Sequence, residues 1–210
     1  MIPFTSYLPE VLPYVPGCPR AVAMNAIRKA VIELCQRAHV WRHTDTVSTV
    51  IDQGEYQITI PDKSKPMLLK GVAYNGRDIN PITEDELDRR SASWRSSTGS
   101  PQRYLEVTPN LVRIYPIPDA VEVDALSFRV VLKPSRDAIE APDHIYDDYS
   151  GAIAAGALSE LLMQTGKPWA EPKASPAHGA KFEYAVAQAS MRVRKSHTTA
   201  KLRVAARPFA

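Results

Sequence analysis

Residues 142–195 read PDHIYDDYSGAIAAGALSELLMQTGKPWAEPKASPAHGAKFEYAVAQASMRVRK and predict two helices joined by a turn. Asp143, a favoured N-cap residue type, begins the first helix, and Gly166 ends it. Ser175 is placed to cap the second helix, with Pro176 at the first position, where proline is tolerated. The turn between them is rich in proline, so we expect it to be ordered. The stretch therefore predicts a helical hairpin of residues 143–165 and 175–196.

The first helix of this hairpin is apolar or small on nearly every side. Its large apolar residues include Ile153, Leu158, Leu161 and Leu162, and its small residues include Ala152, Ala154, Ala155 and Gly156. A helix of this composition is covered by neighbours on several sides. Small side chains also allow a neighbouring helix to approach closely, from the same subunit or from another one.

A third long helix is expected nearer the N-terminus. Pro19 opens it, and apolar residues recur at helical spacing as far as Trp41. Residues 1–18 contain four prolines with aromatic and aliphatic residues between them. They predict an extended arm that lies on its own domain or on a neighbouring copy.

Between residues 45 and 133 the hydrophobic pattern has the period of strands. The turn Asn75-Gly76 is a strong hairpin signal, and Thr83 with Glu86 forms a capping box that begins one short helix. Trp94 lies in a polar loop, where we expect it to be exposed. Roughly six or seven strands fit the whole stretch.

These patterns predict an α+β fold. The expected architecture is an antiparallel helical bundle of residues 19–41, 143–165 and 175–196, with a β-rich insertion between the first and second long helices. The expected domains are an extended arm (1–18), a helical domain (19–44 and 134–196), a β-rich inserted domain (45–133) and a C-terminal docking segment (197–210).

The composition fits a soluble globular protein of 210 residues with a formal net charge of +3. No apolar run is long enough to cross a bilayer, and the N-terminal residues are too rich in proline for a signal peptide. There are two cysteines, too few for a disulfide framework, and Cys35 lies on an apolar helical face, where a buried thiol is usual. We therefore expect synthesis in a reducing cytoplasm and no membrane association.

The positive charge is concentrated at the C-terminal end. After Glu183 the sequence has no acidic residue but has six basic ones: Arg192, Arg194, Lys195, Lys201, Arg203 and Arg207. Cations at a helix end suit the helix dipole, which accounts for two or three of them. The rest indicate a polyanion or an acidic protein as partner.

Residues 197–210 mix these charges with apolar side chains, as expected of a segment that becomes ordered on a partner. The predicted docking residues are His197, Lys201, Leu202, Arg203, Val204, Arg207 and Phe209. For Arg192, Arg194 and Lys195 two interpretations stay open, contact with nucleic-acid phosphates or contact with a protein.

No motif for catalysis, for a metal or for a cofactor is present. His39 and His43 have ligand spacing, but no further ligand motif adjoins them. Asp143, His144 and Asp147 could serve acid–base chemistry, yet acidic residues at a helix N-terminus have an electrostatic explanation. We therefore expect no enzyme activity and no cofactor.

The order of several short motifs resembles that of the head-to-tail adaptor (connector) proteins of tailed bacteriophages. The matching features run from about residue 19 to residue 196. They are a first helix ending at Trp41, the pair Glu55-Tyr56, LVRIYPIP at 111–118, Pro134, the helix start Pro142-Asp143, the turn Lys167-Pro168-Trp169, and a helix with Lys181, Phe182 and Tyr184.

The resemblance implies a structural virion protein that forms a homo-oligomeric ring, commonly of twelve copies, with a lumen for double-stranded DNA during ejection. Its partners would be the portal protein, which the C-terminal segment would bind, and a downstream tail or nozzle protein, which the β-rich domain would face. Asn75, Gly76 and Trp94 are the expected residues of that distal contact. The alternative is a stand-alone protein that binds nucleic acid through its basic C-terminus, independently of sequence.

Overall fold

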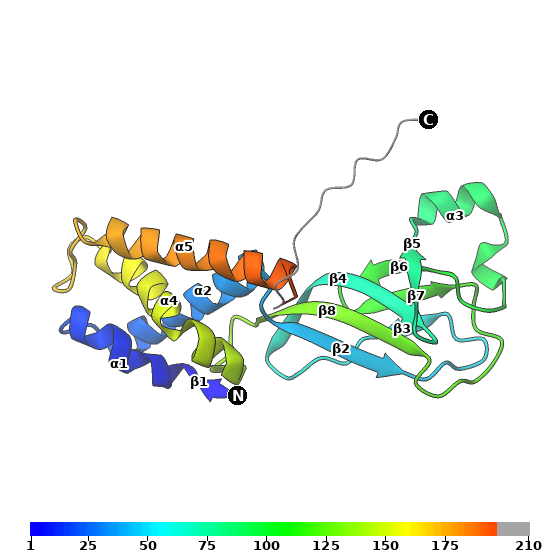
Figure 1. Cartoon of the computed structure of the whole chain (residues 1–210), viewed down its shortest axis with the longest axis horizontal. Coiled ribbons are helices and arrows are strands. Elements are labelled where there is room, and N and C mark those ends of the chain that lie inside the picture. The colour runs from blue at the N-terminus through cyan, green and yellow to red at the C-terminus, as the bar shows by residue number, and fades with distance from the viewer. Residues whose placement is uncertain (197–210) are drawn as a thin grey trace. The chain divides into compact units, whose positions relative to one another are not determined.

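The computed structural model describes residues 1–196, and these divide into two compact units. Unit 1 consists of Met1–Val40 and the described part of Ala138–Ala210. Unit 2 consists of Trp41–Asp137. Figure 1 shows that the helices labelled α1, α2, α4 and α5 belong to unit 1, whereas the long strands belong to unit 2.

Unit 1 is built on three long helices with short elements around them. The long helices are α2 (Arg20–Ala38), α4 (Asp143–Leu162) and α5 (Ser175–Arg194). The short elements are the strands β1 (Ile2–Pro3) and β9 (Glu140–Ala141), the 3-10 helices η1 (Phe4–Tyr7) and η2 (Leu12–Tyr14), and the helix α1 (Leu8–Val11).

Helix α4 lies at the centre of unit 1 and packs against α1, α2, α5 and η1 (Figure 1). This position follows from its sequence, because a helix that is apolar or small on nearly every side is stable in water only when neighbours cover it. Nine of its residues are buried, with Ile145, Ile153, Ala157 and Leu161 fully inaccessible.

The small residues of α4 serve contacts within the subunit. A Cβ added at Gly156 would lie 2.9 Å from Cδ2 of Phe182 on α5 and 3.1 Å from Cβ of Ala30 on α2. On α5, a Cβ added at Gly179 would lie 3.0 Å from Oγ of Ser159. The close helix approach that the sequence predicted is therefore made by α2 and α5 of the same chain at Gly156.

The expectation that residues 1–18 form an extended arm was wrong. Apart from the two residues of β1, most of this segment consists of helical turns, and Phe4, Tyr7, Leu8 and Val11 are buried. Prolines at the first positions of α1 and η2 are compatible with helical starts. The segment covers α4, and β1 pairs antiparallel with β9 just before α4 begins.

Unit 2 contains a curled seven-stranded sheet in the order β2-β8-β4-β5-β6-β7-β3 (Figure 1). Of its six pairs of neighbouring strands, five are antiparallel and one, between β5 and β6, is parallel. The strands are β2 (Arg42–Val47), β3 (Glu55–Gln57), β4 (Ser64–Tyr74), β5 (Arg77–Pro81), β6 (Arg103–Thr108), β7 (Leu111–Tyr115) and β8 (Leu126–Pro134). Helix α3 (Glu84–Arg90) and the 3-10 helix η3 (Trp94–Ser96) connect β5 to β6.

The curl of the sheet has a local cause in β4, its longest strand. Two irregularities in its pairing with β8, at Pro66/Leu68 and at Leu69/Gly71, mark bulges. Bulges bend a strand and increase its twist, so the strands beyond β4 turn away from the plane of β2 and β8. Val72 on β4 and Phe128, Val130 and Leu132 on β8 are buried in the resulting core.

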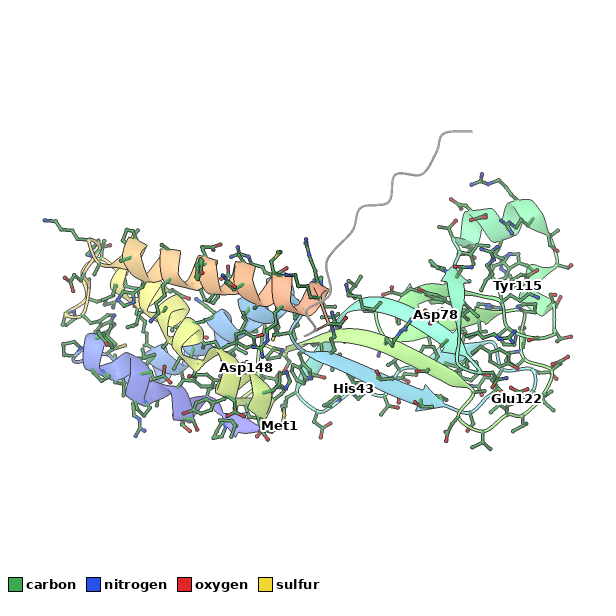
Figure 2. The ribbon with its side chains drawn as sticks, in the orientation of Figure 1. Met1, His43, Asp78, Tyr115, Glu122 and Asp148 are labelled. Atoms are coloured by element: carbon green, nitrogen blue, oxygen red, sulfur yellow. The ribbon has the colours of Figure 1, made fainter. Side chains whose placement is uncertain are left out.

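Side chains join the two ends of the curled sheet. The backbone N–H of Thr59, just after β3, donates to Oδ2 of Asp45 on β2 at 2.7 Å. The Nε2 atom of His43, which Figure 2 labels on β2, lies 3.0 Å from the carbonyl oxygen of Thr59. Two side chains of one edge strand thus satisfy both backbone groups of Thr59, which gives this edge of the sheet a partner.

The predicted architecture, an antiparallel helical bundle with a β-rich insertion, was wrong. The described residues instead form a curled seven-stranded sheet and five α-helices. Unit 1 includes a strand pair and a folded N-terminal segment, and unit 2 includes α3 and a parallel strand pair. Periodicity and helix end signals identified the three long helices, but they carried no information on how the short elements cover them.

Two details of the turns show the same contrast. The hairpin turn was predicted correctly, because Asn75 and Gly76 have φ of 48° and 74° and join β4 to β5. The predicted cap at Ser175 was wrong. Ser175 is the first residue of α5, and its hydroxyl donates to the carbonyl oxygen of Ser159 on α4 at 2.9 Å. Within residues 1–196, no helix has the length and apolar character needed to cross a membrane.

We expect Gly156→Ala to lower the free energy of unfolding by about 1–3 kcal/mol, because overpacking at the contact with Ala30 and Phe182 outweighs the better helix propensity of alanine. Denaturant unfolding monitored by circular dichroism would measure it. Gly151→Ala on the same helix is the matched control, since its added Cβ meets nothing closer than 3.9 Å. The packing account fails if both variants are equally stable.

We expect Asp45→Ala to speed exchange of the Thr59 amide hydrogen several-fold, because a net contribution of about 1 kcal/mol from this hydrogen bond is lost. Asp45→Asn keeps an oxygen acceptor at the same place and should retain most of the protection. Hydrogen exchange resolved by NMR measures both variants. Equal protection in the wild type and in Asp45→Ala would show that this bond does not hold the end of the sheet.

Candidate interaction surfaces

The three predicted contact residues at the basic end of α5 differ in their exposure to solvent. Arg192 and Arg194 are exposed, Lys195 is half-buried, and Val193 between them is buried in unit 1. A guanidinium nitrogen of Arg192 lies 3.7 Å from a carboxylate oxygen of Asp148 on α4, which Figure 2 labels. Arg194 forms no ion pair with any described residue, so its charge is available to a partner.

A shallow hollow of about 620 Å³ lies beside this basic end, between α4 and α5. Small residues, Ala152, Ala185 and Ala189, line it, and the exposed side chains of Tyr184 and Met191 stand at its rim. Burial raises the pKa of Tyr149, which also lines the hollow, and the nearby charge of Arg192 opposes that rise. The mixture of apolar, amide, cationic and carboxylate groups suits a protein side chain or an extended segment.

The prediction that Trp94 is exposed was wrong. Only 2% of its surface is accessible, and it packs in a cluster with Ile82, Leu87 and Leu105. Its indole N–H donates to Oδ1 of Asp88 at 2.7 Å, and this bond together with Arg95 lowers the pKa of the Asp88 carboxyl.

Two guanidinium groups cover the indole of Trp94 instead of solvent. Arg95 lies 4.4 Å and Arg113 5.0 Å from the ring centroid, within the range of cation–π attraction. Arg95 also pairs with Glu84 and Asp88, and Arg113 pairs with Glu55. The role of Trp94 in the structure is therefore to fix these charged side chains, and the loop sequence gave no sign of it.

The turn Asn75-Gly76 is exposed, as a surface contact requires. The side-chain amide of Asn75 donates to Oε2 of Glu122 at 2.7 Å, and its backbone N–H donates to the carbonyl oxygen of Ala125 at 2.8 Å. The turn is thus attached to the loop that precedes β8. Near it the structure exposes four aliphatic residues that the sequence interpretation missed: Val50, Ile51, Val121 and Val123.

The sequence did contain a signal for the last two of these. Val121 and Val123 alternate with Glu122 and Asp124, which is the pattern of a strand, but the aspartates and the preceding Pro118 are more typical of a loop.

The predicted docking residues of the C-terminal segment lie outside the described residues. They are His197, Lys201, Leu202, Arg203, Val204, Arg207 and Phe209.

Two of the residues considered for chemistry, Asp143 and His43, have partners within the described part of the chain. Asp143 pairs with the amino group of Met1 at 2.5 Å, and His43 bonds to Thr59. Within residues 1–196 no cluster of three or more His, Cys, Asp or Glu side chains could hold a metal ion. Burial raises the pKa of the Cys35 thiol to about 12, so this thiol is un-ionised at neutral pH.

Comparison with known proteins identifies the family. A search of curated proteins found no match. A family model described as SU10 adaptor protein matches residues 9–206, nearly the whole chain. The match includes both units, the basic end of α5 and most of the C-terminal segment. The chain belongs to the SU10 adaptor protein family, a family of phage head–tail adaptors.

Proposed function

We propose that this chain forms the homo-oligomeric ring that joins the portal protein to the tail of a phage, with double-stranded DNA passing through its lumen. The observation that carries the proposal is the family match over residues 9–206, which describes a structural component of the virion. Twelve copies made in the host cytoplasm are the expected assembly. The ring is not an enzyme; it provides surfaces and a passage.

The portal side of the ring is the end of unit 1 that carries the basic residues. The hollow between α4 and α5 lies beside this basic end, and α5 is followed in the sequence by residues 197–210. Their basic and apolar side chains fit a groove on the portal with acidic and apolar groups. The tail side is the part of unit 2 that carries the turn Asn75-Gly76, whereas the buried Trp94 is not part of that surface.

Arg194 is better placed than Arg192 to contact DNA. Arg192 already has the carboxylate of Asp148 nearby, and phosphate contact would compete with that pair. Twelve exposed copies of Arg194 would form a belt of positive charge that holds DNA through phosphates, independently of sequence and weakly at high salt. The same residue would serve a stand-alone DNA-binding protein, which differs by binding DNA before assembly.

Removal of residues 197–210 should abolish binding to the portal while unit 1 and unit 2 stay folded. Size-exclusion chromatography with light scattering on a mixture with purified portal would measure complex formation, and circular dichroism would report folding. Two full-length variants identify the cause: Leu202→Ser/Val204→Ser/Phe209→Ser removes the apolar anchors, and Lys201→Gln/Arg203→Gln/Arg207→Gln removes the charges. Normal complex formation by the truncated chain would refute the docking role.

Arg194→Glu should cause loss of packaged DNA from assembled particles without changing the stability of the subunit. Arg192→Glu, in contrast, should lower the free energy of unfolding of the subunit by at most about 1 kcal/mol, because the exposed pair with Asp148 is lost. Lys173→Glu, in the exposed turn before α5, makes the same charge change elsewhere on unit 1 and is the control.

A nuclease-protection assay at two salt concentrations measures DNA retention in these variants. Equal retention by Arg194→Glu and Lys173→Glu would leave Arg194 without a role in DNA contact. Salt-dependent DNA binding by the isolated wild-type chain, measured by fluorescence anisotropy, would favour the stand-alone nucleic-acid-binding alternative.

A further inference from the structure

Two loops at one end of the unit 2 sheet form a platform that we call the tip. The tip consists of residues 48–53, between β2 and β3, residues 118–125, before β8, and the turn Asn75-Gly76. Figure 2 labels Glu122 on this part of unit 2. The tip is separate from the basic end of α5, which belongs to unit 1.

The tip is held rigid by hydrogen bonds between its loops. Thr49 is fully buried, and its N–H donates to the carbonyl oxygen of Glu122 while its hydroxyl donates to that of Ala120, both at 2.9 Å. The N–H of Asp124 donates to Oγ of Ser48 at 3.0 Å, and the N–H of Asp52 donates to the carbonyl oxygen of Pro118 at 3.1 Å. Loops tied in this way keep one conformation before any partner arrives.

Four aliphatic side chains project from this rigid platform into solvent. The exposed fraction is 46% for Val50, 52% for Ile51, 62% for Val121 and 80% for Val123. Single exposed aliphatic residues are common on protein surfaces, but four of them on two mutually bonded loops form a group. Such a group is typical of a contact surface for another protein.

The charged residues within the two loops of the tip are all acidic. Residues 46–54 and 117–125 contain Asp52, Asp119, Glu122 and Asp124 but neither lysine nor arginine, and only Arg77 follows the turn. Asp52, Asp119 and Asp124 are exposed and form no ion pair with any described residue. The tip is therefore an apolar patch with an acidic rim.

This chemistry selects the kind of partner. Carboxylates repel nucleic-acid phosphates, so the tip does not contact DNA. Two tips would repel each other through their acidic rims, so the tip does not pair with the tip of a second copy. An apolar segment flanked by lysine or arginine would bury the aliphatic side chains and neutralise the rim.

We propose that the tip docks a protein segment that is apolar at its centre and carries lysine or arginine at its edges, on the tail component that follows this adaptor. The inference rests on the proposed function only for the identity of the polypeptide that carries this segment. The chemistry of the segment rests on the tip alone. Because the loops are already ordered, little conformational entropy is lost on docking.

Photo-cross-linking in assembled virions tests which polypeptide meets the tip. Val123 is replaced by the photoreactive p-benzoylphenylalanine, and Val107 on β6, whose exposed fraction is 45%, is replaced in the same way as control. Mass spectrometry should place the Val123 cross-link on a tail polypeptide, within an apolar segment next to lysine or arginine, and should find no such product from Val107. Cross-links to the portal, to DNA or to residues 197–210 of another copy would overturn the proposal, as would an equal product from both positions.

Neutralisation of the rim tests its charge. Asp52→Asn/Asp119→Asn/Asp124→Asn keeps side-chain size, and asparagine tolerates the positive φ of 62° at position 52 and 53° at position 124. Tail attachment to adaptor-bearing heads, followed by electron microscopy, should slow about tenfold because electrostatic steering is lost. Asp62→Asn/Asp85→Asn/Glu106→Gln removes three exposed carboxylates elsewhere on unit 2 and should not slow it. Equal rates for the two triple variants would overturn the proposal.

The two possible failures are distinguishable in these experiments. If the ring does not join portal to tail, wild-type particles lack it at that junction, yet the chemistry of whatever cross-links to Val123 still decides the inference. If the ring is present on the portal in the triple tip variant and tails attach at the wild-type rate, the proposed function stands and the inference about the tip is refuted.

Discussion

The need to cover α4 determines the organisation of unit 1. Beyond the exposed acidic residues of its first turns, the helix is apolar or small on most sides, so α2, α5 and the folded N-terminal segment cover it. The contact at Gly156 brings α2 and α5 close enough for Ala30 and Phe182 to touch the same point on α4. Around the outside, exposed pairs such as Arg37 with Glu183 join the helices, and the hydrogen bond from Arg37 lowers the pKa of that glutamate.

The covering of α4 also determines which surfaces remain for partners. Gly156 is occupied by helices of the same chain, whereas Ala152 lines the open hollow between α4 and α5. In unit 1 the exposed surface includes the basic end of α5 with the hollow beside it. In unit 2 it includes the acidic and apolar tip. A protein that joins two different partners needs two surfaces of different chemistry, and the charges of these two surfaces have opposite sign.

The sequence was sufficient where the structure is decided locally. Asn75-Gly76 favours one turn type because both residues accept positive φ, and Thr83 accepts a hydrogen bond from the N–H of Glu86 as its capping box predicts. The long helix of residues 20–38 follows from periodicity, and the helical hairpin from its end signals and the proline-rich turn between its helices. In each of these cases the residues that make the interaction are neighbours in the chain, so the pattern contains the whole cause.

The sequence was insufficient where a distant partner decides. The prolines of residues 1–18 suggested an extended arm, but burial on α4 selected helical turns that proline also permits. Trp94 stands among polar neighbours in the chain, and only the fold brings Leu87, Leu105 and two arginines around it. Ser175 is a residue type that favours caps, yet its hydroxyl donates to the carbonyl oxygen of Ser159 on the other helix.

The valines of the tip were missed for the opposite reason. An apolar residue in a strand-like pattern is expected to be buried within the chain, and these valines are exposed.

Exposure of the tip valines is tolerated because the loops that carry them are held by buried polar contacts. Thr49 has no access to solvent and makes three hydrogen bonds to backbone groups of Ala120 and Glu122 in the neighbouring loop, so the fold does not depend on burying Val121 or Val123. Stability and binding are thereby assigned to different residues. The valines and the acidic rim can change to suit a partner while Thr49, Ser48 and Asn75 keep the platform in place, which is the arrangement expected of a surface whose task is recognition.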